Sequence, residues 1–306
     1  MLIQRGFDIN ILVTGATGFI GSNLIKKLIS SHHEVIACIR SNSNSSQAQL
    51  PFSVKKVSWD HNTDLSEQIA ELKIDVIVHL ATLYSTSEEI SDTLEMVDSI
   101  TKTSLNIMSL ASKHSIPVVF ANSYSTTISN QDKPGSIYAL LKSFDHEIAR
   151  YFNDRYGLRA IELSLFDTYG PNDKRKKFLT ELIRSLIAGK EFLASGGKQL
   201  IDLTHVDDIC AAIEIAILEI TSSGFESIKS YSVASQNPVT LQNLAKVVFE
   251  ATGIQPRVVW GAMPYRKYEL FEYKLAYDLI PGWIPKKHLH IGIQEIFEEL
   301  SRIKND

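Results

Sequence analysis

A glycine-rich segment near the amino end most constrains how this chain can fold. Residues 11–14 are mostly apolar, and Gly15, Gly18 and Gly21 follow with the spacing G-x-x-G-x-x-G. An amphipathic run over residues 22–29 comes next. This order predicts a strand, a tight turn and the first turn of a helix. Such a unit suits a dinucleotide, because its pyrophosphate needs close backbone approach and the positive end of a helix.

The three glycines have different expected tasks. Gly15 would form the turn, Gly18 would let the pyrophosphate approach, and Gly21 would let the helix pack tightly on the strand. An ordinary strand-to-helix turn that binds nothing is the alternative interpretation.

Composition narrows the class of protein. The chain has 306 residues, 44% of them hydrophobic and 22% charged, with a net charge of −4. These values indicate an ordinary globular protein with no basic surplus for nucleic acid or membrane surfaces. The two cysteines, Cys38 and Cys210, form no disulfide framework, and we expect no metal site. No apolar run reaches membrane-spanning length and residues 1–8 do not resemble a signal peptide, so a cytoplasmic location is expected.

Short β-branched runs alternate with amphipathic runs along the chain. Strands are expected over residues 11–14, 34–39, 54–59, 75–80, 117–121, 161–165 and 231–234. Helices are expected over residues 22–30, 65–72, 88–113, 137–156, 178–188, 239–252 and 290–303. This alternation predicts an α/β fold with a doubly wound parallel sheet, the Rossmann arrangement.

The end of the second expected strand bears on the choice of cofactor. An acidic residue there would bind the ribose of NAD, but the strand runs into Arg40, with Ser41 and Ser43 beside it. A cation followed by hydroxyls favours the 2′-phosphate of NADP(H), while NAD(H) stays open. Asp60, after the third strand, would reach the adenine amino group or serve only as a turn residue.

Three residues have the chemistry of a proton-transfer site. Tyr138 and Lys142 are four residues apart in an expected helix and therefore share a face, and Ser123 closes the fifth strand. A neighbouring ammonium favours the phenolate form of a tyrosine, and a serine hydroxyl can hold a carbonyl or alcohol oxygen. Lys142 can also bond the nicotinamide ribose. The alternative is a solvated lysine beside a half-buried tyrosine.

Several motifs together make the sequence resemble the extended short-chain dehydrogenase/reductases, the NAD-dependent epimerase/dehydratase family that acts on nucleotide sugars. The motifs are T-G-A-T-G-F-I-G from Thr14, V-H-L-A from Val78, the Ser123, Tyr138 and Lys142 triad, Y-G-P from Tyr169, H-V-D-D from His205, and R-x-x-E from Arg266. The resemblance implies catalytic roles for the triad. It implies that Thr17, Phe19, Ile20, Leu80 and Ala81 join the three glycines, Arg40 and Asp60 at the cofactor.

The resemblance also implies a smaller carboxy-terminal substrate domain. The cofactor domain would comprise residues 1–166 plus about 201–236, and the nucleotide-sugar domain about 167–200 and 237–306. The implied substrate contacts are Tyr84, Ser123, Ser125, Asn172, Phe178, Lys198, Arg266 and Glu269. The basic run over residues 174–177 is either a solvated loop or part of this site. A homodimer through the helices over 88–113 and 137–156 is expected by analogy.

Departures from the family pattern narrow the reaction. The acids that dehydratases carry are replaced by Ser123, Tyr124 and Ser125, so dehydration is not expected. Further likenesses are to the reductases that make CDP-linked 3,6-dideoxyhexoses, the abequose and paratose synthases. We therefore expect NADPH-dependent reduction of the C4 keto group of a 4-keto-6-deoxy or 3,6-dideoxy sugar nucleotide, in deoxysugar or O-antigen biosynthesis. An NAD-dependent 4-epimerase is the alternative, and a non-catalytic dinucleotide sensor is a third.

Overall fold

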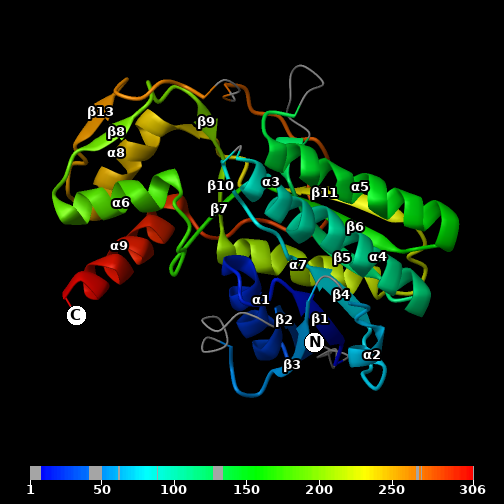
Figure 1. Ribbon diagram of the computed structural model, residues 1–306. Helices are drawn as coiled ribbons and strands as arrows, with labels where there is room; N and C mark the ends of the chain where they lie inside the picture. The colour runs from blue at the N-terminus through cyan, green and yellow to red at the C-terminus, as the bar shows by residue number, and fades with distance from the viewer. Residues whose placement is uncertain are drawn as a thin grey trace.

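Seven strands form the central sheet of the computed structural model, in the order β11-β6-β5-β4-β1-β2-β3 (Figure 1). Every neighbouring pair is parallel. The strands are β1 (Asn10–Thr14), β2 (Glu34–Arg40), β3 (Lys55–Trp59), β4 (Val76–His79), β5 (Val118–Ser123), β6 (Ala160–Leu165) and β11 (Ile228–Val233). The expected doubly wound parallel sheet is therefore confirmed. The structure describes residues 8–40, 50–60, 63–87, 89–126, 134–266, 269 and 271–305.

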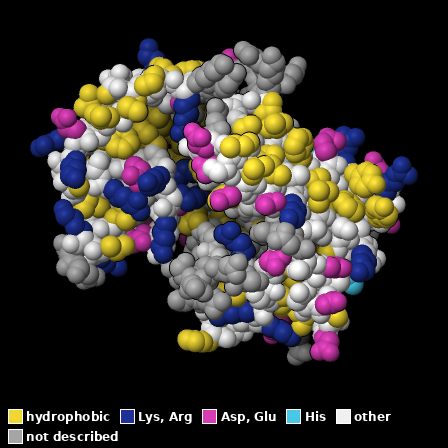
Figure 2. Space-filling model, in the orientation of Figure 1, with side chains coloured by type: hydrophobic (Ala, Val, Ile, Leu, Met, Phe, Trp, Pro, Cys, Tyr) yellow, Lys and Arg dark blue, Asp and Glu magenta, His cyan; other side chains and the backbone are white. Residues whose placement is uncertain are grey.

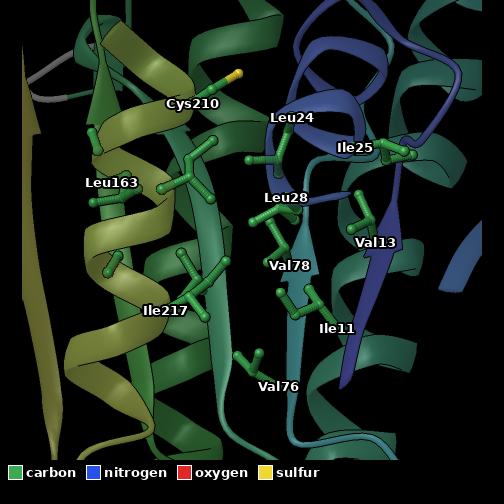
Figure 3. Packing of buried hydrophobic residues seen from close by; sticks show 14 of the residues in the cluster. Ile11, Val13, Leu24, Ile25, Leu28, Val76, Val78, Leu163, Cys210 and Ile217 are labelled. Carbon is green, nitrogen blue, oxygen red and sulfur yellow. The ribbon is translucent and has the colours of Figure 1, made fainter. Parts of the chain in front are cut away.

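The central strands are buried on both faces, which explains their continuous apolar runs. In β1, Ile11 and Val13 point to one face of the sheet and Leu12 points to the other. The first face packs against α1 (Phe19–Ser30) and α7 (Val206–Ile220), as Figure 3 shows for Leu24 and Ile217. The second face packs against α4 (Thr103–His114) and α5 (Ile137–Tyr156).

The helix expected over residues 88–113 forms over residues 90–114, but it is not α-helical throughout. The structure has α3 (Ile90–Val97), a π-helical turn over Asp98–Lys102, and then α4. The hydroxyl of Thr103 donates to the carbonyl of Asp98, five residues earlier, at 2.9 Å. This wider turn changes the side-chain period where α3 meets α4, and neither glycine nor proline marks it in the sequence. The helix expected over 65–72 is also shorter, as α2 (Ser66–Ile69).

A second lobe has its own apolar core. It contains α6 (Phe178–Ala188), α8 (Leu241–Thr252) and α9 (Leu289–Asn305), which bury residues such as Leu182, Leu244 and Ile293 among themselves. Two small strand pairs cover this core, namely β8 (Phe192–Ala194) with β13 (Val258–Trp260), and β9 (Leu200–Ile201) with β12 (Val239–Thr240).

The helix expected over residues 239–252 begins two residues later. Val239 and Thr240 pair antiparallel with β9 instead. Thr240 caps α8, because its hydroxyl accepts a hydrogen bond from the backbone N–H of Asn243 at 3.1 Å. Tertiary pairing therefore overrides the apolar period at these two positions.

Two short parallel strands join the lobes. They are β7 (Asp167–Tyr169), where the chain leaves the large sheet, and β10 (Leu203–His205), where it returns. Just beyond β10, the buried carboxylate of Asp208 accepts the backbone N–H groups of Lys286 and Lys287 at 3.0 and 2.9 Å. The H-V-D-D motif thus fastens α7 to the segment that leads into α9.

The two cysteines are free and buried on opposite faces of the sheet. Cys38 belongs to the core under α4, and Cys210 belongs to the core under α7. Burial raises the pKa of each thiol to about 12. Among the described residues, no helix combines the length and apolarity that crossing a bilayer requires.

Candidate active site

The glycine loop after β1 is a cradle that excludes side chains. Gly15 has φ +66°, and a Cβ atom there would lie 2.6 Å from the carbonyl carbon of Leu80. A Cβ on Gly21 would lie 2.2 Å from the carbonyl oxygen of Gly15, and one on Gly18 would lie 3.1 Å from it. Gly21 is thus packed against the turn itself. A side chain at Gly15 or Gly21 would therefore force the backbone of this turn to move.

The amino end of α1 fits a phosphate group. Its N-cap residue is Gly18, so no N-cap side chain bonds to the N–H groups of the first turn. The first turn also contains no acidic residue. The first N–H groups of a helix have no partner within it, so they and the helix dipole can bind an anion. Both the cradle and the helix end therefore suit a dinucleotide pyrophosphate.

The ends of β1 and β4 meet below this loop. The N–H of Ala81 donates to Thr14 Oγ1 at 3.2 Å, and the N–H of Leu80 donates to the carbonyl of Thr14 at 3.3 Å. The distance between His79 Nδ1 and Thr14 Oγ1 is 2.7 Å. The structure thus places the backbone of Leu80 and Ala81 against the cradle.

Arg40 and Asp60 stand at the carboxyl ends of neighbouring strands. Arg40 is in register with Trp59, and Asp60 follows directly. Both residues are exposed at the carboxyl ends of the strands, the same end of the sheet at which the glycine loop lies. Thr17, Phe19 and Ile20 are partly buried at the start of α1. Ser41 and Ser43 lie outside the described residues.

Helix α5 carries Tyr138 and Lys142, and the Lys142 side chain reaches strand β5. Ser136 caps the helix by accepting the N–H of Ala139 at 3.1 Å, so the helix starts just before Tyr138. Tyr138 is partly exposed, whereas Lys142 is buried. The ammonium of Lys142 donates to the carbonyl of Ala121 at 2.7 Å and to the carboxylate of Asp145 at 2.5 Å.

Lys142 stays charged despite its burial. Desolvation disfavours its ammonium, but the charge of Asp145, the interaction with Tyr138 and the hydrogen bond to Asp145 outweigh it. The pKa of Lys142 is therefore raised above its usual value.

Behind this pair, a buried chain of polar side chains reaches back to the cradle. Asp145 accepts from Ser104 Oγ at 2.6 Å, Ser104 Oγ lies 3.1 Å from His79 Nε2, and His79 contacts Thr14. The side chains of Asp145, Ser104, His79 and Thr14 come from four separate elements, and each residue is at most 2% exposed. One connected network therefore joins the glycine loop to Lys142.

A second buried network holds Ser123. Its N–H donates to Asn122 Oδ1 at 2.8 Å, and Asn122 Nδ2 donates to Glu162 at 2.5 Å. Glu162 also accepts from Ser230 Oγ at 2.8 Å and from His146 Nδ1 at 2.6 Å. These bonds fix the amide of Asn122 and so the end of β5.

The hydroxyl of Ser123 faces another hydroxyl. Ser123 Oγ lies 2.8 Å from Ser125 Oγ, in the short 3₁₀ segment Tyr124–Thr126. The neighbouring Tyr124 donates to Asp167 Oδ2 at 3.1 Å. The charge of Asp167, burial, the hydrogen bond to Asp167 and the charges of Tyr84 and Glu269 raise the pKa of Tyr124 well above its usual value. Tyr124 therefore acts as a hydrogen-bond donor, and Glu269 lies close enough to influence it.

Two tyrosines of the sheet domain meet a lysine of the second lobe beside the site. The ring of Tyr84 meets Tyr138 edge to face, with ring centroids 5.0 Å apart. Lys177 Nζ lies 4.3 Å from the centroid of Tyr84 and 3.4 Å from Asp167 Oδ1. Lys177 therefore connects the start of α6 with the tyrosines of the large domain.

The basic run over residues 174–177 has two faces. Lys174 and Lys176 are exposed, whereas Arg175 and Lys177 are partly buried. The guanidinium of Arg175 lies 4.7 Å from the centroid of Phe19, donates twice to the Asp173 carboxylate, and donates to the carbonyl of Thr168 at 2.8 Å. The run is thus partly a contact between the second lobe and the glycine loop.

The remaining candidate substrate residues are spread over the second lobe. Asn172 is exposed at φ +66°, and its N–H donates to Glu299 at 2.7 Å, while Phe178 packs edge to face on Phe192. Lys198 is exposed and donates its N–H to the hydroxyl of Tyr265 at 3.3 Å. This contact brings the loop of Lys198 beside Arg266, whose N–H donates to Glu269 at 3.4 Å.

Sequence reasoning missed several residues of the site. Asp145, Ser104, Glu162 and His146 support the candidate triad, and Asp167 supports Lys177 and Tyr124. Only Asp145 has a local signal, because it lies three residues after Lys142 on the same helix. The others depend on contacts between distant segments.

A family model described as "NAD dependent epimerase/dehydratase family" matches residues 11–228. Among curated proteins, the CDP-abequose synthase of Salmonella typhimurium is 28% identical over 95% of this chain and 98% of its own length. Two solved structures share the fold over nearly the whole chain. MoeE5 in complex with UDP-glucose and NAD has a TM-score of 0.80 at 25% identity, with 97% of this chain and 100% of that chain covered. The UDP-glucose 4-epimerase of Thermotoga maritima with UDP-glucose has a TM-score of 0.82 at 20% identity, with the same coverage.

Proposed function

Because the chain belongs to the NAD-dependent epimerase/dehydratase family, we propose that it reduces the C4 keto group of a nucleotide-activated 4-keto-6-deoxy or 3,6-dideoxyhexose with NADPH. A CDP-linked sugar is the first candidate, as in the name of the CDP-abequose synthase relative. The observation that carries the proposal is the charged, buried Lys142 one helical turn from Tyr138. Ser123 stands at the end of the strand whose Ala121 carbonyl holds that lysine.

Each residue of the triad has a distinct role in this reaction. Tyr138 gives its proton to the C4 oxygen, and Ser123 orients that oxygen by a hydrogen bond. Lys142 bonds the nicotinamide ribose and stabilises negative charge on Tyr138. The bound dinucleotide supplies the hydride that adds to C4, so the ketone becomes an alcohol and Tyr138 regains a proton from solvent.

The cofactor would lie along the carboxyl edge of the large sheet. Gly15 would form the turn, Gly18 would let the pyrophosphate approach the amino end of α1, and Gly21 would keep that helix packed on the turn. Arg40 would bind the 2′-phosphate, and Asp60 would meet the adenine. Thr17, Phe19, Ile20, Leu80 and Ala81 complete the proposed cofactor site.

The substrate would lie between the lobes. We assign residues 1–166 plus about 201–236 to the cofactor domain, and about 167–200 and 237–306 to the nucleotide-sugar domain. Lys198 and Arg266 would bind the diphosphate, because their segments contact each other through Tyr265. In Figure 2, lysine and arginine side chains gather over the lobe that carries α6 and α9, which suits an anionic substrate. The other proposed substrate contacts are Tyr84, Ser123, Ser125, Asn172, Phe178 and Glu269.

A second copy of the chain would pack on α4 and α5. Leu105, Phe144 and Tyr151 are 45%, 40% and 54% exposed on these helices. Apolar side chains gathered on adjacent helices are typical of a protein interface. The proposed homodimer predicts that Phe144→Glu yields monomers in analytical ultracentrifugation.

A 4-epimerase that retains NAD is the second candidate, and it is supported by likeness to MoeE5, whose solved structure holds NAD together with UDP-glucose. Such an enzyme would retain NAD and show no net change in nicotinamide absorbance.

The deciding experiment follows nicotinamide absorbance while the purified protein turns over a CDP-4-keto-6-deoxyhexose or its 3-deoxy form. Stoichiometric NADPH consumption that Tyr138→Phe abolishes supports the reductase. A 4-epimerase acts on a C4 alcohol, so its arm of the experiment uses UDP-glucose: inversion at C4 with no net change in nicotinamide absorbance would establish the epimerase. Near-full reduction of the keto sugar by Tyr138→Phe would remove Tyr138 from its role.

A further inference from the structure

The charge of Lys142 is neutralised inside the protein. Asp145 has no exposed surface, and its Oδ2 atom accepts directly from the Lys142 ammonium. The side chain of Lys142 is only 5% exposed, so water screens the pair little. Because the two residues are three positions apart on α5, one helix holds both charges on one face.

Several polar and charged groups lie near this pair. Ser104 on α4 donates to Asp145, and His79 on β4 stands behind Ser104. Besides Asp145, Lys142 interacts electrostatically with Tyr138 on α5 and with Glu162 on β6. Asp145 is the carboxylate that bonds Lys142 directly, and it is therefore the strongest counter-charge within this site.

We propose that Asp145 is a positioning residue that holds Lys142 at the Ala121 carbonyl and, by neutralising it, keeps the Tyr138 phenol protonated at working pH. This inference rests on the proposed roles of Tyr138 and Lys142 and deepens them. It concerns the protonation of Tyr138 before any substrate binds, so it does not depend on which sugar the enzyme uses.

The physical reason is the charge of the site. With Asp145 ionised, the protonated Tyr138 and Lys142 form a site in which one positive charge meets one negative charge. Without the carboxylate, a positive charge stays buried alone. Loss of the Tyr138 proton then becomes easier, because the phenolate would replace the missing carboxylate as the counter-charge of Lys142.

A protonated tyrosine suits one direction of the chemistry. A ketoreductase begins its chemical step with Tyr138 as an acid, whereas a 4-epimerase begins by removing a proton from an alcohol. Asp145 therefore favours the state from which reduction starts. The basicity that an epimerase requires would be better served by an unneutralised lysine.

The test is a titration of Asp145→Asn, which keeps the shape of the side chain and removes its charge. The phenolate absorbance of the cofactor-free protein is followed with pH for wild type and for Asp145→Asn. For each of them, the titration of the same protein with Tyr138→Phe added is subtracted, so that the signal of Tyr138 remains. The alkaline limb of kcat/KM for NADPH is measured in parallel. We expect the first proton to leave at a pH lower by about one to three units, with the alkaline limb moving equally.

Glu147→Gln is the matched control, because it removes one carboxylate charge from the same helix at a side chain that is 62% exposed. Its alkaline limb should stay at the wild-type pH, and Asp145→Glu should restore that position. If Asp145→Asn does not fold, Asp145→Ser serves as the second uncharged variant. An unshifted alkaline limb in a folded uncharged variant would overturn the proposal.

The two proposals fail in different ways. The phenolate titration uses neither substrate nor cofactor, so a shift there supports the role of Asp145 even if no keto sugar is reduced. Conversely, NADPH consumption with no shift in Asp145→Asn would support the reductase and discard the role of Asp145.

Discussion

His146 Nδ1 lies 2.6 Å from Glu162 Oε2, and this carboxylate is almost completely buried beside the strand that ends in Ser123. The hydrogen bond to Glu162 outweighs desolvation and raises the pKa of His146. Burial opposes the charge of Glu162, but hydrogen bonds from His146, Ser230 and Asn122 together with the His146 charge lower its pKa. Each partner therefore favours the ionised form of the other.

This pair makes stability depend on pH. The contribution of His146 is complete below its unfolded pKa of 6.5 and is lost as pH rises through the higher folded value. The contribution of Glu162 is present above its unfolded pKa of 4.5 and is lost as pH falls through the lower folded value. We expect His146→Gln to lower unfolding free energy by about 1–3 kcal/mol between these two pH values, and by less at higher pH. Urea denaturation across the range checks this, and a pH-independent difference would contradict it.

The glycine cradle can be tested with two substitutions that share a backbone conformation. Gly15 and Gly157 have φ +66° and +68°, but a Cβ on Gly157 would meet nothing within 4 Å. Gly157→Ala should therefore lower stability by about 1 kcal/mol and leave NADPH binding intact. Gly15→Ala should lower stability further and weaken NADPH binding, because its Cβ would collide with the backbone of Leu80. Equal effects of the two substitutions on binding, measured by fluorescence titration, would argue against a cradle.

The contact of α7 with the segment that leads into α9, here called the clamp, depends on the carboxylate of Asp208. Asp208 accepts two backbone N–H groups, and an asparagine could accept only one while turning a donor toward the other. Asp208→Asn should thus lower the unfolding free energy by about 1–3 kcal/mol. Asp207→Asn is the matched control, since the Asp207 side chain is 65% exposed on the same helix, and it should change stability by less than about 0.5 kcal/mol. Similar losses in the two variants would show that the clamp contributes little.

The choice of dinucleotide depends on Arg40 in our proposal. Replacing this cation by glutamine should weaken NADPH binding by roughly 10- to 100-fold, because a charge-assisted bond to the 2′-phosphate is lost. Binding of NADH, which lacks that phosphate, should not change. Lys56→Gln removes an equal charge from the next strand but should leave both affinities unaltered. Calorimetric titration of the three proteins measures these differences, and a parallel loss for NADH would remove Arg40 from phosphate recognition.

Local patterns in the sequence predicted the large sheet well. Apolar runs such as Ile11–Val13 report burial on both faces, and the glycine spacing after them marks the turn into α1. The same is true of the spacing between Tyr138 and Lys142, which a helix places on one face. In these cases the relevant neighbours lie within about one helical turn or one strand of each other.

Features that depend on distant contacts were not predictable in this way. The π-helical turn at Asp98–Lys102 carries no glycine or proline, and β12 forms only because Val239 finds Ile201. The links from His79 to Ser104 and from Asn122 to Glu162 join residues 25 and 40 positions apart. A serine or a histidine in a sequence does not reveal which buried partner it will meet.

The paired crossings β7 and β10 have a consequence for how the chain can be divided. The polypeptide passes into the second lobe after Leu165 and comes back at Leu203, and strand β11 then joins β6 at the sheet edge. A gene fragment ending near residue 166 would therefore encode a sheet that lacks one edge strand and the helix α7 that covers its face. The two lobes are spatial units but not separable lengths of sequence, so recombination that exchanges specificity between relatives must replace interleaved segments together.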